Sequence, residues 1–104
     1  MCQVSHVGRR ANASVGAWLP ALGPSHTREE YNRSFAHEMD HHDIARIVRD
    51  FGQAARRARD GGLDGIETMT GGHLIGQFLS PMVNRRTDAF GGPLENRMRF
   101  LRMV

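Results

Sequence analysis

Apolar positions repeat with a helical period over one long segment in the middle of the chain. The spacing is the i, i+3, i+4, i+7 pattern that lines one face of an α-helix. Asp40 is suited to cap the first turn, and glycines at 61 and 62 supply the stop signal. The pattern therefore predicts an amphipathic helix from 40 to 60. Its apolar stripe consists of Ile44, Ile47, Val48, Phe51, Ala54, Ala55 and Ala58.

Short apolar or alternating runs flank this helix. Residues 2–7 and 63–69 are typical of strands, and a short helix is expected to begin at 76–78. A second longer helix is expected over 93–104, with Pro93 in its first turn and Leu94, Met98 and Leu101 along one face. The order strand, helix, strand, helix predicts parallel strands joined by a crossover.

Residues 8–39 carry no sustained period and are rich in Gly and Pro. Loops of this length are uncommon in compact domains unless they serve a function. We expect a functional loop with short helical turns.

Composition narrows the class of protein. A chain of 104 residues holds one small domain, and its net charge of +3 is weak evidence for nucleic acid. The densest basic cluster, at 56–60, is expected to be a solvated helix end where cations complement the dipole.

No apolar run is long enough to cross a bilayer, and no signal peptide is recognised at the start. The single cysteine excludes an internal disulfide. We expect a cytoplasmic protein with no nucleic-acid or membrane partner.

Histidines at 37 and 41 are four residues apart, a spacing that metal sites can use. No cysteine or third well-spaced ligand accompanies them, so no metal site is predicted.

Two separated motifs carry a resemblance. The first motif is "GGHLIGQFLSPMVNRRTDAFGGPLENRMRF" at 71–100, preceded by "LDGIE", and the second is "QVSHVGRR" at 3–10. Together they resemble the old yellow enzyme family of FMN-dependent oxidoreductases. The resemblance implies an α/β fold, a partial (β/α)₈ TIM barrel made of about the third and fourth strands with their helices. A whole barrel needs about 250 residues. Residues 1–104 are therefore expected to be a fragment of a single FMN-binding domain.

The resemblance also implies site residues. Gln3 stands where the family glutamine binds the pyrimidine edge of FMN, and an amide offers that edge both a donor and an acceptor. Family members that reduce conjugated carbonyls hold the carbonyl with a His pair or a His/Asn pair and carry a proton-donating Tyr. Here Thr68 or Met69 takes the first His position, and His73 stands at the Tyr position. His73 is the candidate catalytic residue, because imidazole transfers protons near neutral pH. The alternative is a histidine that only orders its loop.

This variant of the loop resembles the branch of trimethylamine dehydrogenase and of the dimethylglycine and proline betaine demethylases. Such enzymes pass a hydride from an N-methyl carbon to the flavin, and their cationic substrates favour aromatic faces. Trp18 and Tyr31 are the candidate substrate-binding aromatics, with packing on the barrel rim as the alternative. The implied partners are FMN, a small methylated amine, the remainder of the barrel, and either NAD(P)H or an electron-transfer protein.

Other readings remain open at this point. The enzyme could instead reduce enones, or the chain could be a non-catalytic remnant that associates with itself or a partner through exposed edges. Whether the chain alone is an enzyme is undecided, and we expect it to hold FMN weakly or not at all. Arg85, Arg86 and Asp88 are expected to tie their loop to the barrel, and Glu95 and Arg99 to form an i, i+4 pair.

Overall fold

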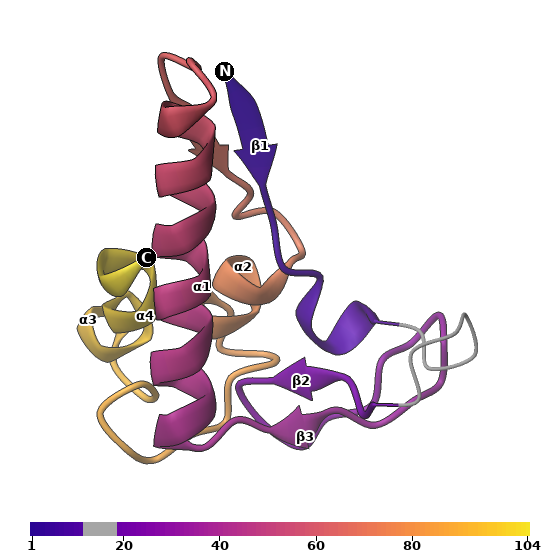
Figure 1. Ribbon diagram of the computed structural model, residues 1–104. Helices are drawn as coiled ribbons and strands as arrows, with labels where there is room; N and C mark the ends of the chain where they lie inside the picture. The colour runs from indigo at the N-terminus through magenta and orange to yellow at the C-terminus, as the bar shows by residue number, and fades with distance from the viewer. Residues whose placement is uncertain (12–18) are drawn as a thin grey trace.

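The computed structural model describes residues 1–11 and 19–104, so the predicted substrate residue Trp18 lies outside the described residues. A long helix runs through the molecule, with the strand pair β1–β4 beside its upper half and the shorter helices around its middle (Figure 1). The elements are β1 (Cys2–Val4), the 3₁₀ helix η1 (Gly8–Arg10), β2 (Leu22–Gly23), β3 (His37–Glu38), α1 (His41–Asp60), β4 (Ile66–Thr68), α2 (Leu74–Leu79), α3 (Leu94–Arg97) and α4 (Arg99–Met103).

The two predicted strands pair in parallel. β1 and β4 form a two-stranded sheet in which Gln3 is opposite Glu67 and Val4 is opposite Thr68. The intervening α1 makes the crossover connection, as the order of elements predicts. Both strands are shorter than the runs that predicted them, since each has three residues.

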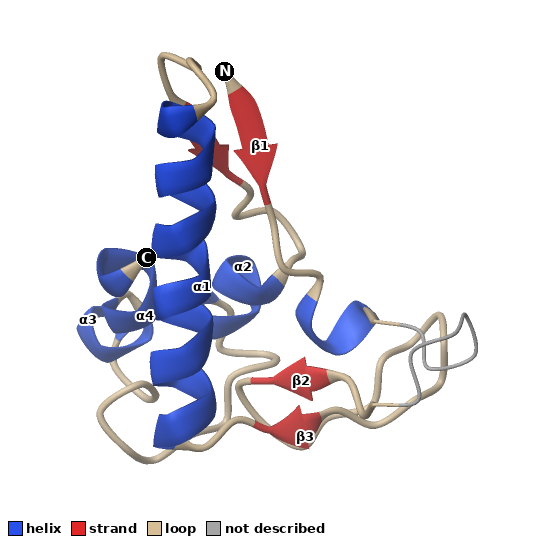
Figure 2. Ribbon diagram, in the orientation of Figure 1, coloured by secondary structure: helices blue, strands red, loops and turns tan. Residues whose placement is uncertain are grey.

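The loop between β1 and α1 contains one expected feature and one that the sequence did not predict. η1 is a short helical turn of the expected kind, whereas β2 and β3 pair in parallel as a second small sheet that was not predicted (Figure 2). Each of these strands has two residues, which is too short for an alternating pattern to be recognised.

Helix α1 confirms its predicted cap. The Asp40 carboxylate accepts from the Asp43 N–H at 2.8 Å, and the Asp43 carboxylate accepts from the Asp40 N–H at 3.4 Å. This reciprocal pair is a capping box, which satisfies amides that have no partner within the helix. At the other end the Gly61 N–H donates to the Arg57 carbonyl at 2.9 Å.

One core holds the elements together. α1 contributes Ile44, Ile47 and Phe51, and α2 buries three of its residues against them. Phe78 of α2 stacks on Phe100 of α4 with ring centroids 4.3 Å apart. The full buried set is Met39, Ile44, Ile47, Phe51, Leu74, Ile75, Phe78, Phe90 and Phe100.

The C-terminal segment is helical but differs in detail from the prediction. It is split into α3 and α4 at Met98, and Leu94, expected on the apolar face, is 56% exposed. Phe100 is the buried residue instead, because it meets the Phe78 ring across the core. Arg99 donates to the Ala89 carbonyl at 2.8 Å, and no ion pair joins it to Glu95, so the predicted i, i+4 pair is wrong for these two described residues.

Within residues 1–11 and 19–104, no helix combines the length and apolar character that a membrane span requires. The same part of the chain gathers no group of three or more His, Cys, Asp or Glu side chains suited to a metal ion.

Candidate functional site

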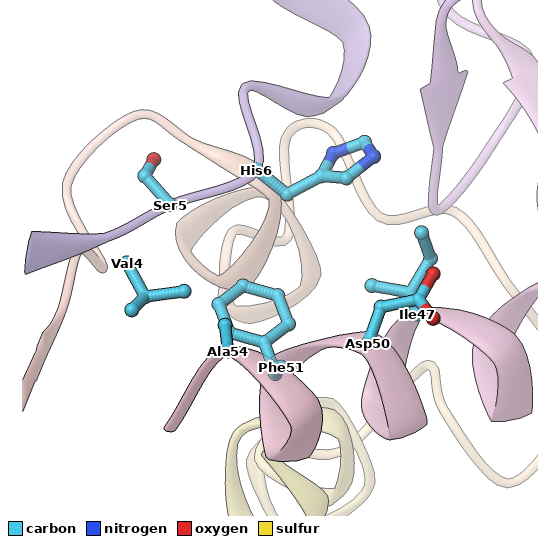
Figure 3. Close-up of a pocket in the computed structure, with 7 residues that line it drawn as sticks. All are labelled: Val4, Ser5, His6, Ile47, Asp50, Phe51 and Ala54. Atoms are coloured by element: carbon cyan, nitrogen blue, oxygen red, sulfur yellow. The ribbon is translucent and has the colours of Figure 1, made fainter. Parts of the chain in front are cut away.

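The strand pair has one apolar side and one polar side. Val4 packs towards the core, and by strand alternation Gln3 and Ser5 point to the opposite side. Figure 3 shows this directly: Val4 points towards α1, and the Ser5 hydroxyl points away from that helix. We call the surface formed by Gln3, Ser5, Glu67 and His73 the polar face.

Gln3 and Glu67 form the first contact of the polar face. They are register partners on β1 and β4, and the Gln3 Nε2 donates to the Glu67 Oε2 at 3.2 Å. Both side chains are exposed. Because the amide nitrogen turns towards the carboxylate, the Gln3 Oε1 remains available as an acceptor.

His73 and Ser5 form the second contact. His73 is the N-cap residue of α2, but its side chain makes no capping bond to that helix. The Ser5 Oγ and the His73 Nδ1 hydrogen-bond to each other instead, which joins the end of β1 to the start of α2. The imidazole is therefore fixed through one nitrogen, while its residue remains half-buried.

The remaining predicted substrate residues are dispersed. Thr68 is half-buried at the end of β4, and the half-buried Met69 donates its N–H to the Val4 carbonyl at 3.3 Å. Tyr31 is 89% exposed in the loop between β2 and β3, and among the described residues its side chain makes no hydrogen bond to the polar face. The described residues thus bring Gln3 and His73 to one face, and do not bring Tyr31 to it.

Gln77 is an organising residue that the sequence reasoning missed. Its buried side chain accepts from the Arg9 N–H at 2.9 Å through Oε1. Its Nε2 donates to the Val7 carbonyl at 3.0 Å and to the Gly72 carbonyl at 3.1 Å. One amide therefore holds the turn after β1 against the turn before α2. The only available signal was its place in the "QFLSP" motif.

Gly8 leaves the space that lets the Gln77 side-chain amide approach the backbone of the turn after β1. A Cβ at position 8 would collide with the Gln77 side-chain amide, and the Gly8 φ of 63° lies in the left-handed region that favours glycine. The glycine of the "HVGRR" segment is thus required by both space and backbone conformation.

His6 lies on the other side of β1, towards α1. Its Nδ1 accepts from the Gly8 N–H at 3.0 Å, which places the proton of the neutral ring on Nε2. Burial lowers the pKa of His6 below its ordinary value, the positive charge of Arg46 lowers it further, and Asp50 opposes the shift. A cavity of about 200 Å³ separates this part of β1 from α1 (Figure 3). Its lining is mainly apolar, so we do not place the chemistry there. It is lined by Val4, Ser5, His6, Ile47, Asp50, Phe51 and Ala54.

Arg86 and Asp88 anchor the loop that follows α2, as predicted. The Arg86 side chain is 5% exposed and donates to the Pro24 carbonyl at 3.0 Å and to the Met39 carbonyl at 2.6 Å. It also holds Asp88 through two nitrogens, at 3.0 Å from Nε and 2.6 Å from Nη2. This hydrogen-bonded guanidinium holds the pKa of Asp88 below its ordinary value. Arg85 contributes through its backbone N–H, which donates to the Ser25 Oγ at 2.9 Å.

Comparisons with known proteins identify the family of the chain. Residues 1–104 match the NADH:flavin oxidoreductase / NADH oxidase family. The chain is 56% identical over 100 residues to a multifunctional alkene reductase/demethylase of Caballeronia cordobensis, and 48% identical over 100 residues to a probable N-methylproline demethylase of Rhizobium meliloti. Each alignment covers 96% of this chain, and the chain spans 15% of the length of each relative.

Solved structures give the same answer for the fold. Morphinone reductase in complex with tetrahydroNAD superposes with a TM-score of 0.91 at 32% identity, over 97% of this chain and 32% of that one. The old yellow enzyme homologue from Zymomonas mobilis superposes with a TM-score of 0.87 at 30% identity, over 97% of this chain and 31% of that one. The predicted α/β fold, with two parallel strands and their helices as part of a TIM barrel, is confirmed. The chain belongs to the NADH:flavin oxidoreductase / NADH oxidase family, the family of the old yellow enzymes.

Proposed function

We propose that this chain supplies the third and fourth strand–helix units of a single FMN-binding barrel, and that the complete enzyme removes methyl groups from amines. The observation that carries the proposal is the polar face, where a flavin-suited amide and an imidazole lie on one side of a parallel strand pair. Sites in barrels of this type are built at the carboxyl ends of the strands.

The residues present fit one edge of FMN. Gln3 offers an acceptor oxygen and a second N–H besides the one given to Glu67, which suits the alternating donors and acceptors of a pyrimidine ring. FMN, when bound, would accept the hydride from the substrate carbon. In this proposal Gln3 orients that ring, and the phosphate is held by loops after later strands of the barrel.

Three features support an amine rather than a carbonyl substrate. Thr68 or Met69 stands where the family has the first histidine of its carbonyl-holding pair. The pair of side-chain donors that would hold a carbonyl oxygen is therefore incomplete. Glu67 places a carboxylate on the polar face, which suits a cationic nitrogen. Two of the named relatives are called demethylases.

Reduction of conjugated carbonyls is the second candidate, because the Caballeronia cordobensis relative is also called an alkene reductase. A nicotinamide dinucleotide would then supply electrons, as the structure of morphinone reductase with tetrahydroNAD suggests for that enzyme. For the demethylase, NAD(P)H or an electron-transfer protein would be the electron partner.

A hybrid barrel tests the two candidates. In it, this chain replaces the matched 100-residue segment of the Caballeronia cordobensis relative, to which it is 56% identical. Under anaerobic conditions, N-methylated glycine or proline should bleach the flavin of the hybrid. If an enone reoxidises the reduced hybrid efficiently and no methylated amine bleaches it, the ene-reductase function holds instead.

His73→Asn in the hybrid tests the site. Removal of a proton-transferring group ordinarily costs about 100-fold or more in rate. We therefore expect amine-dependent bleaching to slow by about that factor, while FMN stays bound. His37→Asn is the matched control, since His37 is an exposed histidine on β3. An unchanged bleaching rate in His73→Asn would show that the site assignment is wrong.

A further inference from the structure

Ser5 is a polar residue with no role in the resemblance, yet among the described residues its hydroxyl makes the only side-chain hydrogen bond of His73. The two residues are 68 positions apart in the chain. The hydroxyl comes from the residue directly after β1 and the ring from the N-cap of α2, so the contact exists only when the strand and the helix are packed together.

The backbone of His73 is already held on both sides. Its carbonyl accepts from the Gln77 N–H at 2.8 Å, and the next residue, Leu74, donates its N–H to the His6 carbonyl at 2.9 Å. The preceding Gly72 carbonyl accepts from the Gln77 side chain. What these bonds leave free is rotation of the imidazole about its own side-chain torsions. The Ser5 contact at Nδ1 removes that freedom.

A hydroxyl suits this position for a chemical reason. Serine both donates and accepts, whereas an imidazole nitrogen accepts when unprotonated and donates when protonated. Ser5 can therefore keep its bond to Nδ1 in either protonation state of the ring. An aliphatic side chain could keep it in neither state.

We propose that Ser5 is a positioning residue that holds His73 through Nδ1, so that Nε2 is the nitrogen that exchanges a proton with the substrate. This inference rests on the proposed function. A secondary or tertiary methylamine arrives as an ammonium ion. In the neutral ring that accepts the proton, the Nδ1–H donates to the Ser5 Oγ and Nε2 is unprotonated. The N–H bond of the substrate breaks and the proton moves to Nε2, which leaves the nitrogen lone pair free and the imidazole protonated. The lone pair is what allows a hydride to leave the N-methyl carbon.

The charged groups around His73 come from two neighbouring elements. Glu67 lies on the polar face from β4, and the Arg10 guanidinium of η1 lies beside Gly72, 3.3 Å from where a Cβ would be. They have opposite signs, and substitutions at Ser5 leave both in place. A changed pH response in a Ser5 variant therefore reports the hydroxyl contact.

The first experiment uses the hybrid barrel with Ser5→Ala and Ser5→Thr. The readout is the pH dependence of amine binding, followed as the perturbation of the flavin spectrum by an amine that carries no oxidisable methyl group. Ser5→Ala should shift the midpoint of the binding profile and slow amine-dependent bleaching by about tenfold, the equivalent of one good hydrogen bond. Ser5→Thr, which keeps the hydroxyl, should restore both. Ser34→Ala is the control, because the Ser34 hydroxyl is buried and has no hydrogen-bond partner within residues 1–11 and 19–104.

The second experiment does not need flavin. The 104-residue chain, labelled with ¹⁵N at histidine, is compared with its Ser5→Ala and His73→Asn forms by NMR, the latter to assign the His73 signals. We expect Ser5→Ala to change the ratio of the two neutral tautomers of His73. Identical His73 signals with and without the Ser5 hydroxyl, or an unchanged binding profile in the hybrid, would overturn the proposal.

The two failures are distinguishable. If no methylated amine bleaches the hybrid, the proposed function fails, while the tautomer measurement still decides whether Ser5 holds the ring. If amines bleach it and Ser5→Ala behaves as Ser34→Ala does, the function stands and the positioning role is lost.

Discussion

At the residue scale, the two side chains that directly follow β1 face opposite environments. Ser5 points to the polar face, where it meets His73, and His6 turns towards α1, where it is enclosed near Ile47 and Asp50. The neutral form of His6 accepts the Gly8 N–H and so helps to fix the turn that Gln77 also holds. Protonation of His6 would remove that acceptor and place a charge in a half-buried site.

The pH dependence of stability follows from His6. Its folded-state pKa lies below the ordinary value of 6.5, chiefly because of burial, so folding favours the neutral ring. This contribution to the free energy of unfolding is present above pH 6.5 and is lost as the pH falls through the lower folded-state pKa. In urea unfolding followed by circular dichroism, the chain should lose stability as the pH falls below 6.5. His6→Gln, which can still accept from Gly8, should flatten this loss.

His42→Gln is the matched control, because His42 is exposed on α1. It should keep the pH slope of the parent chain. Equal flattening in both variants would show that His6 is not the group responsible.

The long loops are ordered at the element scale by single polar side chains. Gln77 joins the turn after β1 to the turn before α2, and Arg86 joins the segment before α1 to the loop after α2. Both side chains are buried and extensively hydrogen-bonded, as buried polar groups must be. Regular structure in these regions is scarce, so these side-chain bonds replace the ladders that strands and helices would provide.

Arg86→Lys should destabilise the chain clearly. Lysine keeps the charge, but it cannot donate to two carbonyls and also form a bidentate pair with Asp88. We expect a loss of about 2–4 kcal/mol in the free energy of unfolding, measured by urea denaturation. Arg85→Lys is the control, since that side chain is exposed and its contact is made by the backbone N–H. Similar losses at both positions would argue against the Arg86 contacts as the cause.

The whole molecule presents its strand pair largely uncovered. Among residues 1–11 and 19–104, β1 pairs with β4 alone, and the polar face carries exposed Gln3 and Glu67. The chain spans 15% of the length of its curated relatives, whereas a TIM barrel closes with eight strands. Uncovered strand edges favour pairing with further strands, whether those of a complete barrel or of a second copy.

We predict that the 104-residue chain, purified with FMN and desalted, retains no flavin in its visible absorption, whereas the hybrid barrel retains it. Gln3→Leu should weaken FMN binding by the hybrid, by about tenfold for the loss of a hydrogen-bonding amide. Gln53→Leu, an exposed glutamine of α1, should not. Retained flavin in the isolated chain would contradict this and would call for a measurement of its oligomeric state by light scattering.

The sequence by itself determined what depends on local spacing and on motifs. The stripe from Ile44 to Phe51 and the Asp40 cap specified α1, because contacts within a few residues decide helix formation. The order of elements specified the parallel pairing of β1 with β4, and "QFLSP" with "NRRTD" indicated the family.

Only the tertiary structure decided which distant residues meet. Ser5 reaches His73, Gln77 reaches Val7, and Phe100 replaces Leu94 in the core, although no periodicity links the members of each pair. β2 and β3 also escaped prediction, since two-residue strands carry no pattern of their own. The physical reason is the same throughout. Local sequence fixes the direction in which a side chain leaves its element, and the packing of elements fixes what it then contacts.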